Sequence, residues 1–173
     1  WQTMQGYWIL MFPTAELNEI TGLDYPDHKI VDWNENHMHM LHLNEHDAKW
    51  YGMYKNYAGV LASHSPEGSA FTGVGHGQVV CCFGFTYMWN GVYEAWLIPT
   101  TENIRKYVIP FHRASMRIFD YAMSKHSMKR LQITVSSENA LALKWAERCY
   151  FNHEGVLQKY GPEGTDYYMM ARY

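Results

Sequence analysis

The C-terminal stretch from Ser136 to Tyr173, SSENALALKWAERCYFNHEGVLQKYGPEGTDYYMMARY, carries the signals of a helix and of a hairpin. Ser136 or Ser137 can cap a helix, and ENALALKWAERC then places apolar residues at helical spacing. HEGVLQKY and DYYMMARY read as two strands, because Gly161-Pro-Glu-Gly-Thr between them is made of turn residues. The stretch therefore predicts a capped helix followed by an antiparallel hairpin.

Three further elements lie directly upstream of this stretch. QVVCCFGFTYMW and VYEAWLIP flank Asn90-Gly91, which predicts a hairpin because both turn residues of such a pair favour positive φ. PFHRASMRIFDYAMSKHS has apolar residues at i, i+3, i+4 spacing with Pro110 in its first turn, so it predicts an amphipathic helix. RLQITVSS alternates apolar and polar residues, as a strand does. From Gln78 the order is β-β-α-β-α-β-β, which predicts an α/β fold with a mixed sheet.

The N-terminal part gives weaker signals. YWILMFP reads as a strand that ends at Pro13, and Thr14 begins what looks like a capped helix that Gly22 should stop. The segment from Ser63 to Gly77 is rich in Gly, Ser and Pro and predicts a loop. Its glycines neither follow a convincing strand nor open a helix, so they give little support to a nucleotide site. No repeat or linker divides the chain, which predicts one domain over residues 1–173.

Composition excludes several classes of function. The 173 residues include 14 Lys and Arg against 17 Asp and Glu, so no global attraction to nucleic acid or to an anionic membrane is expected. No apolar run approaches the roughly 20 residues of a membrane span. The start, WQTMQGYWILMF, lacks the features of a signal peptide. Cys81, Cys82 and Cys149 form an odd set with two adjacent members, which favours a reducing compartment over a disulfide framework.

Two motifs suggest hydrolytic or nucleophilic chemistry, and each has a plainer interpretation. His42-Leu-Asn-Glu45-His46 matches H-x-x-E-H, which on a helix places two zinc ligands and a base on one face. A catalytic zinc also needs a third protein ligand, and a chain with 10 His offers chance matches, so no metal site is predicted. Cys81 and Cys149 lie in apolar patterns that are typical of inert core thiols.

The segment from Thr100 to Pro110, TTENIRKYVIP, is the most informative candidate site. It joins a strand to a helix, and a helix N-terminus offers free backbone N–H groups and a positive dipole end to an anion. The segment contains no glycine, although glycines usually let a backbone approach phosphates. Glu94 lies on the strand that leads into it, where a carboxylate is either a desolvated general base or, as the favoured interpretation, an outward-facing strand residue.

These segments resemble the GNAT acetyltransferase superfamily. Ser136–Tyr173 is similar to the family's S-x-N-x-x-A-L-x-[FYW]-A-E-x-x-G-F-x-x-E-G pattern and its K-Y-G-P-x-G-x-D-Y-Y hairpin. The resemblance implies a mixed, mostly antiparallel sheet with helices on both faces; it is good over residues 78–173, and residues 1–77 are compatible with it. It also implies that the strands before and after the helix at Phe111 run parallel and splay apart near Trp96 to Pro99.

The family's coenzyme A loop runs [QR]-x-x-G-x-[GA], and NIRKYV occupies its register. Asn103 takes the polar position, and Lys106 and Val108 fill the two small-residue positions. Trp145 stands where many members have a Tyr general acid, and Tyr150 where the family usually has Gly. If the chain is active, the resemblance implies Glu94 as the base and a cofactor site of Asn103, Ile104, Arg105, Lys106, Tyr107, Val108 and Asn139. The substitutions predict instead that acetyl-CoA binds weakly or not at all.

The chain looks closest to GNAT-like proteins of short-tailed phages, some of which are virion or head-assembly components. With 7 Trp, 14 Tyr, 7 Phe and 11 Met, residue types that are enriched at protein interfaces, it predicts a degenerate, non-catalytic member that acts through protein contacts. The protein is expected in the virion or in the host cytoplasm. Its expected partners are proteins, with no direct binding of nucleic acid or membrane, and a homo-oligomer stays open. An active acetyl-CoA-dependent N-acetyltransferase is the alternative, and a zinc hydrolase a distant one.

Overall fold

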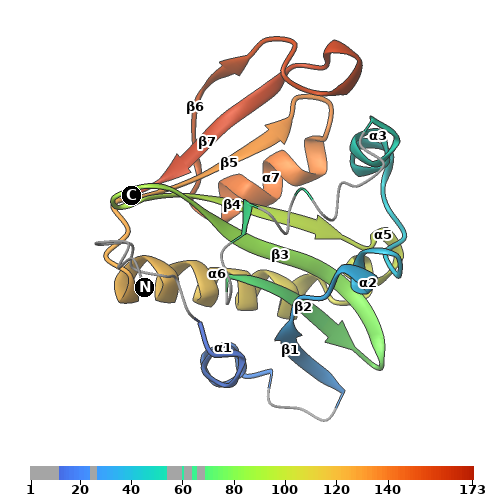
Figure 1. Cartoon of the computed structure of the whole chain (residues 1–173), viewed down its shortest axis with the longest axis vertical. Helices are drawn as coiled ribbons and strands as arrows, with labels where there is room; N and C mark the ends of the chain where they lie inside the picture. Colours follow the sequence, from blue (N-terminus) through green and yellow to red (C-terminus); the bar gives the residue numbers. More distant parts are fainter. Residues whose placement is uncertain (1–11, 24–26, 54–59, 61–63, 66–68) are drawn as a thin grey trace, which may run out of the picture.

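One twisted sheet organises the computed structural model (Figure 1), which describes residues 12–23, 27–53, 60, 64–65 and 69–173. Within those residues the sheet has seven strands in the order β1-β2-β3-β4-β5-β7-β6. The elements are α1 (Thr14–Thr21), β1 (His28–Asp32), α2 (Glu35–Met38), α3 (Glu45–Met53), β2 (Ala70–Gly75), β3 (Gln78–Trp89), β4 (Val92–Pro99), α5 (Thr101–Lys106), α6 (Val108–Lys125), β5 (Arg130–Ser136), α7 (Ala140–Arg148), β6 (Asn152–Leu157), the 3-10 turn η1 (Pro162–Gly164) and β7 (Tyr167–Arg172). The predicted α/β class and the C-terminal hairpin are confirmed.

The sheet is mostly antiparallel. Neighbouring strands pair antiparallel throughout, except that β4 and β5 run parallel. The crossover between these two strands contains α5 and α6, as a parallel connection requires. This one parallel step lies at the centre of the sheet, between the β1–β4 meander and the C-terminal part.

Helices cover both faces, as expected. One face is covered by α1, α6 and α7, whose side chains share a core cluster that includes Leu17, Phe119 and Ala146. The other face is covered by α2 and α3, where Met38 packs with Cys82 and with partners such as Tyr51. The buried residues of α6 recur at helical spacing, which confirms the amphipathic prediction: Ala114, Ser115, Ile118, Phe119 and Ala122.

The hairpin at Asn90-Gly91 is confirmed, with a different turn geometry. Gly91 has φ 81, whereas Asn90 is not among the residues with positive φ. The register of β3 against β4 shifts between Tyr87 and Trp89. The bulge increases the local twist of the hairpin, and it therefore takes the place of a second positive-φ residue in the turn.

Two predicted helix caps are wrong. Helix α1 begins at Thr14 with Pro13 in the cap position, and no side chain caps it, although Gly22 stops it with φ 69 as predicted. Helix α7 is capped by Asn139, whose side-chain oxygen accepts a hydrogen bond from Ala142 N–H at 3.0 Å. Ser136 instead accepts from Glu138 N–H, so it organises the turn that precedes the helix.

The predicted loop over residues 63–77 is also wrong in part. Ala70–Gly75 forms β2, which pairs with β1 on one side and β3 on the other. Glycine is a poor strand residue by itself, but partners on both sides fix the segment. The predicted strand YWILMFP lies outside the described residues apart from its last two positions. None of the described helices combines the length and the apolar character that a membrane crossing requires.

Candidate functional site

Strands β4 and β5 open into a wedge at the centre of the sheet (Figure 1). They pair only at Val92–Arg130, Tyr93–Leu131 and Glu94–Gln132, and then diverge. Strand β4 stays paired with β3 as far as Pro99, so the divergence opens a gap on its β5 side alone. The expected parallel arrangement and splay are confirmed, and the splay begins just after Glu94.

Glu94 lies at the closed end of this wedge. The half-buried carboxylate accepts a hydrogen bond from Gln132 Nε2 at 3.1 Å. Gln132 is 8% exposed, and its side-chain oxygen accepts from Arg130 Nε at 3.1 Å. The carboxylate is therefore held by a neutral, oriented donor and has no direct cation partner among the described ion pairs.

Tyr160 faces the same region from the loop between β6 and β7. Burial and the negative charge of Glu94 raise the pKa of its hydroxyl, and a hydrogen bond with Thr134 opposes that rise. Thr134 follows Gln132 by two residues on β5, so both side chains lie on the same face of the sheet. Glu94, Gln132, Thr134 and Tyr160 thus form one polar group at the wedge.

Helix α3 is fastened to the C-terminal hairpin beside this group. Trp50 Nε1 donates to Tyr167 Oη at 2.7 Å, and the Tyr160 ring lies 6.4 Å from Trp50 and 5.5 Å from Tyr167, centroid to centroid. Gly161 permits this packing, because a Cβ there would lie 2.2 Å from the Tyr167 ring. The absence of a side chain at Gly161 in the segment Lys159-Tyr-Gly-Pro therefore leaves the space that the Tyr167 ring occupies.

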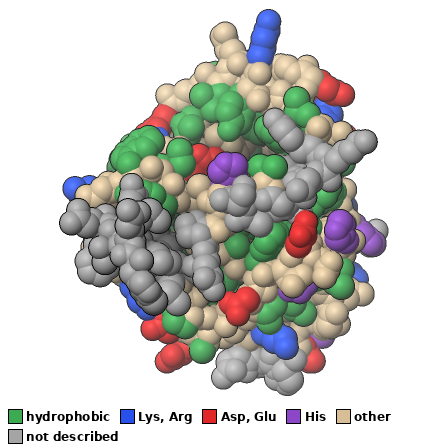
Figure 2. All heavy atoms as spheres, viewed as in Figure 1, with side chains coloured by type: hydrophobic (Ala, Val, Ile, Leu, Met, Phe, Trp, Pro, Cys, Tyr) green, Lys and Arg blue, Asp and Glu red, His purple; other side chains and the backbone are tan. Residues whose placement is uncertain are grey.

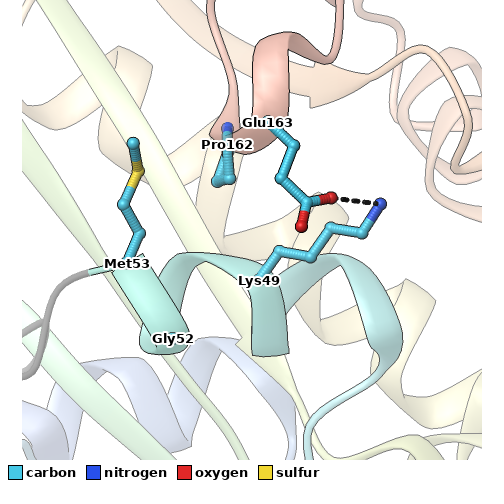
Figure 3. A pocket seen from close by; sticks show the side chains of 5 residues that line it. All are labelled: Lys49, Gly52, Met53, Pro162 and Glu163. Carbon is cyan, nitrogen blue, oxygen red and sulfur yellow. Dashed lines mark ion pairs between the residues drawn. The ribbon is translucent and has the colours of Figure 1, made fainter.

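A pocket of about 330 Å³ lies between α3 and η1 (Figure 3). Lys49, Gly52 and Met53 line it from α3, and Pro162 and Glu163 line it from the loop of the hairpin. Figure 3 marks the ion pair between Lys49 and Glu163. Lys49 Nζ lies 3.6 Å from a carboxylate oxygen of Glu163 and 3.7 Å from one of Glu138. The single cation is thus already shared by two carboxylates, so the pocket offers little to a further anion.

Asp47, in the first turn of α3, is the second carboxylate near the aromatic residues. Desolvation raises its pKa to about 6, against the effect of a hydrogen bond from Asn44 Nδ2 at 2.5 Å. Its charge also contributes to the raised pKa of Tyr167. Asp47 is thus a half-buried carboxylate whose pKa lies well above its usual range.

The segment from Thr100 to Pro110 is not a loop. Residues Thr101–Lys106 form helix α5, Tyr107 ends it, and α6 begins at once with Val108. The predicted coenzyme A loop therefore corresponds to a helix and the first residue of the next one. Ile104 is half-buried, while Arg105 and Lys106 are exposed at the end of α5; the side chain of Asn103 lies outside the described set.

The start of α6 has few free donors. Tyr107 does not cap the helix with its side chain, and its ring instead contacts His28 at 5.1 Å and His76 at 5.7 Å, between centroids. Pro110 has no N–H group, so the first turn can offer only the N–H groups of Val108 and Ile109. Both side chains are exposed, by 55% and 62%, and place apolar surface where an anion would dock.

The positions at the other end of the expected site are also altered. The Trp145 ring packs against Phe111 at 5.7 Å and Phe119 at 6.1 Å, and its buried Nε1 has no hydrogen-bond partner among the described residues. An indole N–H does not act as a general acid. Asn139 uses its side-chain oxygen as the cap of α7, and Tyr150 has φ 63, a conformation that favours glycine.

The geometry behind the hydrolase motif is absent. His42 precedes α3, whereas Glu45 and His46 are its first two residues, so the two histidines do not share a helical face. Glu45 lies 3.4 Å from His46. Within the described part of the chain, no group of three metal-binding side chains is found.

The cysteines are core residues. Burial raises the pKa of Cys81 and of Cys149 to about 12 and that of Cys82 to about 11. Cys149 Sγ lies 3.7 Å from His112 Nδ1, but it is fully buried. None of the three thiols is placed as a nucleophile.

Sequence reasoning missed Gln132, Thr134, Tyr160 and Trp50. The alternation in RLQITVSS could have placed Gln132 and Thr134 on one face of β5. The register that brings Gln132 opposite Glu94 depends on a crossover of thirty residues, from the end of Val92–Pro99 to the start of Arg130–Ser136, and no local pattern encodes it.

The strand order, the central parallel pair and the wedge define the GNAT fold, and comparison with solved structures agrees. The structure matches an acetyltransferase of the GNAT family from Bacillus anthracis with a TM-score of 0.63 and 16% identity, over 87% of this chain and 96% of that one. It matches Ard1 from Thermoplasma volcanium with a TM-score of 0.69 and 15% identity, over 84% and 97%.

A third match is a complex with coenzyme A. RimL, a ribosomal L7/L12 α-N-protein acetyltransferase in complex with coenzyme A, gives a TM-score of 0.62 at 12% identity, over 86% of this chain and 94% of that one. No protein-family model and no curated protein matches the sequence. At these identities the matches establish the fold alone.

The residues present do not fit the phosphate end of acetyl-CoA. A pyrophosphate needs several converging backbone N–H groups, and the α5–α6 junction supplies at most two. The wedge itself, with Glu94 at its closed end, is intact. Within the described residues, the chain therefore keeps the split sheet of the fold and offers at most two free backbone donors at the α5–α6 junction.

Proposed function

We propose that the protein does not transfer acetyl groups and acts through contacts with other proteins, as a virion-associated or head-assembly component of a phage. The observation that carries this proposal is helix α5, Thr101–Lys106, in place of a phosphate-binding loop. The N–H groups inside such a helix are turned toward the preceding turn, as Ile104 N–H is toward Thr100 O. They are not available to a ligand.

Exposed aromatic and aliphatic side chains support a role in protein contacts. Tyr150 is 68% exposed although its backbone is left-handed; that conformation costs roughly 1–2 kcal/mol for a residue with a Cβ, which favours a role for its ring outside the fold. Other exposed apolar side chains include Trp89, Val108, Ile109, Leu141, Val156 and Tyr173. Figure 2 shows hydrophobic side chains at several places on the face seen in the view of Figure 1, with charges of both signs scattered between them.

The phage assignment rests on the resemblance of the loop, helix and hairpin segments to GNAT-like proteins of short-tailed phages. It implies protein partners in the virion or the host cytoplasm. Formal net charge is −3, which gives no general attraction to nucleic acid. A homo-oligomer is compatible with the exposed surface.

Calorimetric titration with acetyl-CoA tests the proposal. We expect a Kd no tighter than about 1 mM, near −4 kcal/mol. The control is an active GNAT acetyltransferase titrated with the same ligand stock. Micromolar binding by this chain would overturn the proposal.

An active N-acetyltransferase is the second candidate, and the position of Glu94 favours it. A half-buried carboxylate beside Gln132 and Tyr160, at the closed end of the wedge, is where a general base could deprotonate an amine. Release of free coenzyme A thiol from acetyl-CoA, measured over a panel of amines, tests it. Turnover that disappears in Glu94→Gln would establish this second function.

A further inference from the structure

The tip of the β3–β4 hairpin brings a carboxamide and a free backbone nitrogen together at Asn90-Gly91. Asn90 is exposed, and its side chain makes no hydrogen bond within the described part of the chain. The hydrogen bond of a four-residue turn joins its first and fourth residues, which here are Trp89 and Val92, the last pair of the ladder. The Gly91 N–H is therefore left out of the turn bond, and it donates to no other backbone group among the described residues.

The other asparagines lack this combination. Asn90 is the one asparagine of the sequence that glycine follows, and a glycine leaves the approach to its own backbone nitrogen open because it has no side chain. Several described asparagines already use the side-chain oxygen to accept a hydrogen bond from a backbone N–H: Asn18, Asn34, Asn44 and Asn139. Asn36 and Asn152 are exposed, but each precedes a histidine.

We propose that Asn90 is a site of spontaneous deamidation, with the backbone nitrogen of Gly91 as the nucleophile. This nitrogen gives its proton to water or hydroxide and forms a bond to Cγ of Asn90. The carboxamide nitrogen leaves as ammonia, and the product is a five-membered succinimide.

Water then opens the succinimide at one of its two carbonyl carbons and breaks the bond from that carbon to the ring nitrogen. Addition at Cγ leaves aspartate at position 90 with a normal backbone. Addition at the backbone carbonyl carbon leaves isoaspartate, in which the main chain runs through Cβ and Cγ. Either way, one carboxamide and one water become one carboxylate and one ammonium ion.

The fold makes the isoaspartate product disruptive. The Gly91 carbonyl accepts hydrogen bonds from Lys129 N–H at 2.8 Å and from Arg130 N–H at 3.0 Å. These bonds fix the start of β5 beside the Val92–Arg130 pair, the first step of the parallel ladder. Isoaspartate adds one methylene group to the main chain directly before Gly91, so the carbonyl cannot keep its position relative to both donors.

The turn has little room to absorb the added methylene. Gly91 is buried, and a Cβ on it would lie 3.2 Å from Lys129 Cγ. Aspartate at position 90 differs from isoaspartate in this respect, because it adds the same negative charge and keeps the main chain unchanged. The two products of one reaction therefore separate the effect of charge from the effect of backbone length.

Incubation of the folded full chain at mildly alkaline pH tests the modification. Peptide mapping by mass spectrometry follows the exchange of amide nitrogen for oxygen at each asparagine, and an isoaspartyl methyltransferase with a labelled methyl donor counts isoaspartate. We expect conversion at Asn90 ahead of Asn36 and Asn152, at a rate that rises with pH because the nitrogen must lose its proton. Asn90→Gln keeps an exposed amide but would need a six-membered ring, so it should lose the modification.

Hydrogen exchange tests the effect on β5. The acidic fraction of aged protein, with its isoaspartate content known from methylation, is compared with the variant Asn90→Asp. We expect faster exchange at the Lys129 and Arg130 amides in the aged fraction than in the variant, which has the charge and the normal backbone.

Three outcomes would overturn the proposal or one of its parts. Conversion of a synthetic peptide spanning the turn, without conversion of Asn90 in the folded chain, would show that the turn keeps the two groups apart. Equal conversion at Asn36 or Asn152 would remove the role of Gly91. Unchanged exchange at Lys129 and Arg130 in a fraction that contains isoaspartate would remove the effect on β5.

The test does not depend on the variants alone or on the proposed function. If Asn90→Gln does not fold, the wild-type chain still compares Asn90 with Asn36 and Asn152 in the same sample. None of the outcomes depends on acetyl-CoA or on a partner protein.

Discussion

Glu94 and Gln132 face each other across the last paired step of β4 and β5, with Gln132 Nε2 donating to the carboxylate at 3.1 Å. The bond lies where the central sheet begins to open. The hydrogen bond between the two side chains therefore links β4 to β5 at the closed end of the wedge.

The first prediction concerns this pair. Gln132→Leu removes the donor and leaves a half-buried carboxylate without it, which should lower the free energy of unfolding by about 1–3 kcal/mol. Urea denaturation of the single variants and of the double variant Glu94→Leu/Gln132→Leu measures the coupling. A double variant as unstable as the sum of the two singles would show that the hydrogen bond contributes nothing.

The second prediction concerns the backbone at Tyr150. Its φ of 63 costs a residue with a Cβ roughly 1–2 kcal/mol, and glycine adds about 0.5–1 kcal/mol of chain entropy. Tyr150→Gly should therefore raise the free energy of unfolding by up to about 1.5 kcal/mol relative to Tyr150→Ala, which keeps the strain and also lacks the ring. Thermal unfolding of both variants decides it, and a glycine variant less stable than the alanine one would contradict it.

The third prediction concerns Gly161. A Cβ there would lie 2.2 Å from the Tyr167 ring, so Gly161→Ala must displace a buried ring and should cost about 1–3 kcal/mol. The bond from Trp50 to Tyr167 should be lost with it, which changes the tryptophan fluorescence of the native state. Gly155→Ala is the control, because a Cβ there meets open space; equal effects at the two positions would rule the explanation out.

The fourth prediction is a pH dependence caused by Asp47. Burial raises its folded-state pKa to about 6, above the roughly 3.9 of an unfolded chain. The folded state therefore binds more protons between about pH 4 and 6, and this carboxyl makes stability fall as pH rises through that window.

Asp47→Asn removes that titration. We expect the variant to gain stability relative to wild type as pH rises from about 4 to 7, and to show no such gain below pH 4. Urea midpoints at a series of pH values measure the difference, which cancels the titration of the histidines common to both proteins. A difference that stays constant with pH would mean that Asp47 titrates normally.

The fifth prediction concerns the thiols. Burial raises the pKa of Cys81, Cys82 and Cys149 to about 11 or 12, and the thiolate is the reactive form. A chromogenic disulfide reagent at neutral pH should react with none of them in the native protein and with all three in guanidinium chloride. Rapid reaction of one thiol in native protein would reopen the case for a cysteine nucleophile.

Local pattern was enough for the elements whose signals lie within one segment. The β3–β4 hairpin is encoded by two β-rich runs around Asn90-Gly91, and α6 by its apolar stripe, so both could be predicted without knowledge of their neighbours. The C-terminal hairpin is similar, because Gly161 and Gly164 mark its turn. The formation of each of these elements depends on contacts between residues close in sequence.

Helix α5 and strand β2 show where local pattern fails. A helix of six residues has too few hydrogen bonds to offset its nucleation in isolation, so TTENIRKYVIP carries no helical signal; its attachment to β4 and α6 makes it helical. The glycine-rich β2 is a strand because β1 and β3 pair with both its edges.

The same division holds for the candidate site. Glu94 could be selected from its own strand, as a carboxylate among apolar residues. Its partners Gln132 and Tyr160 come from β5 and from the loop before β7, and the wedge exists because two parallel strands pair for three residues and then part. Residue types and local periodicity are properties of the chain itself, whereas register across a long crossover is set by how the whole core packs.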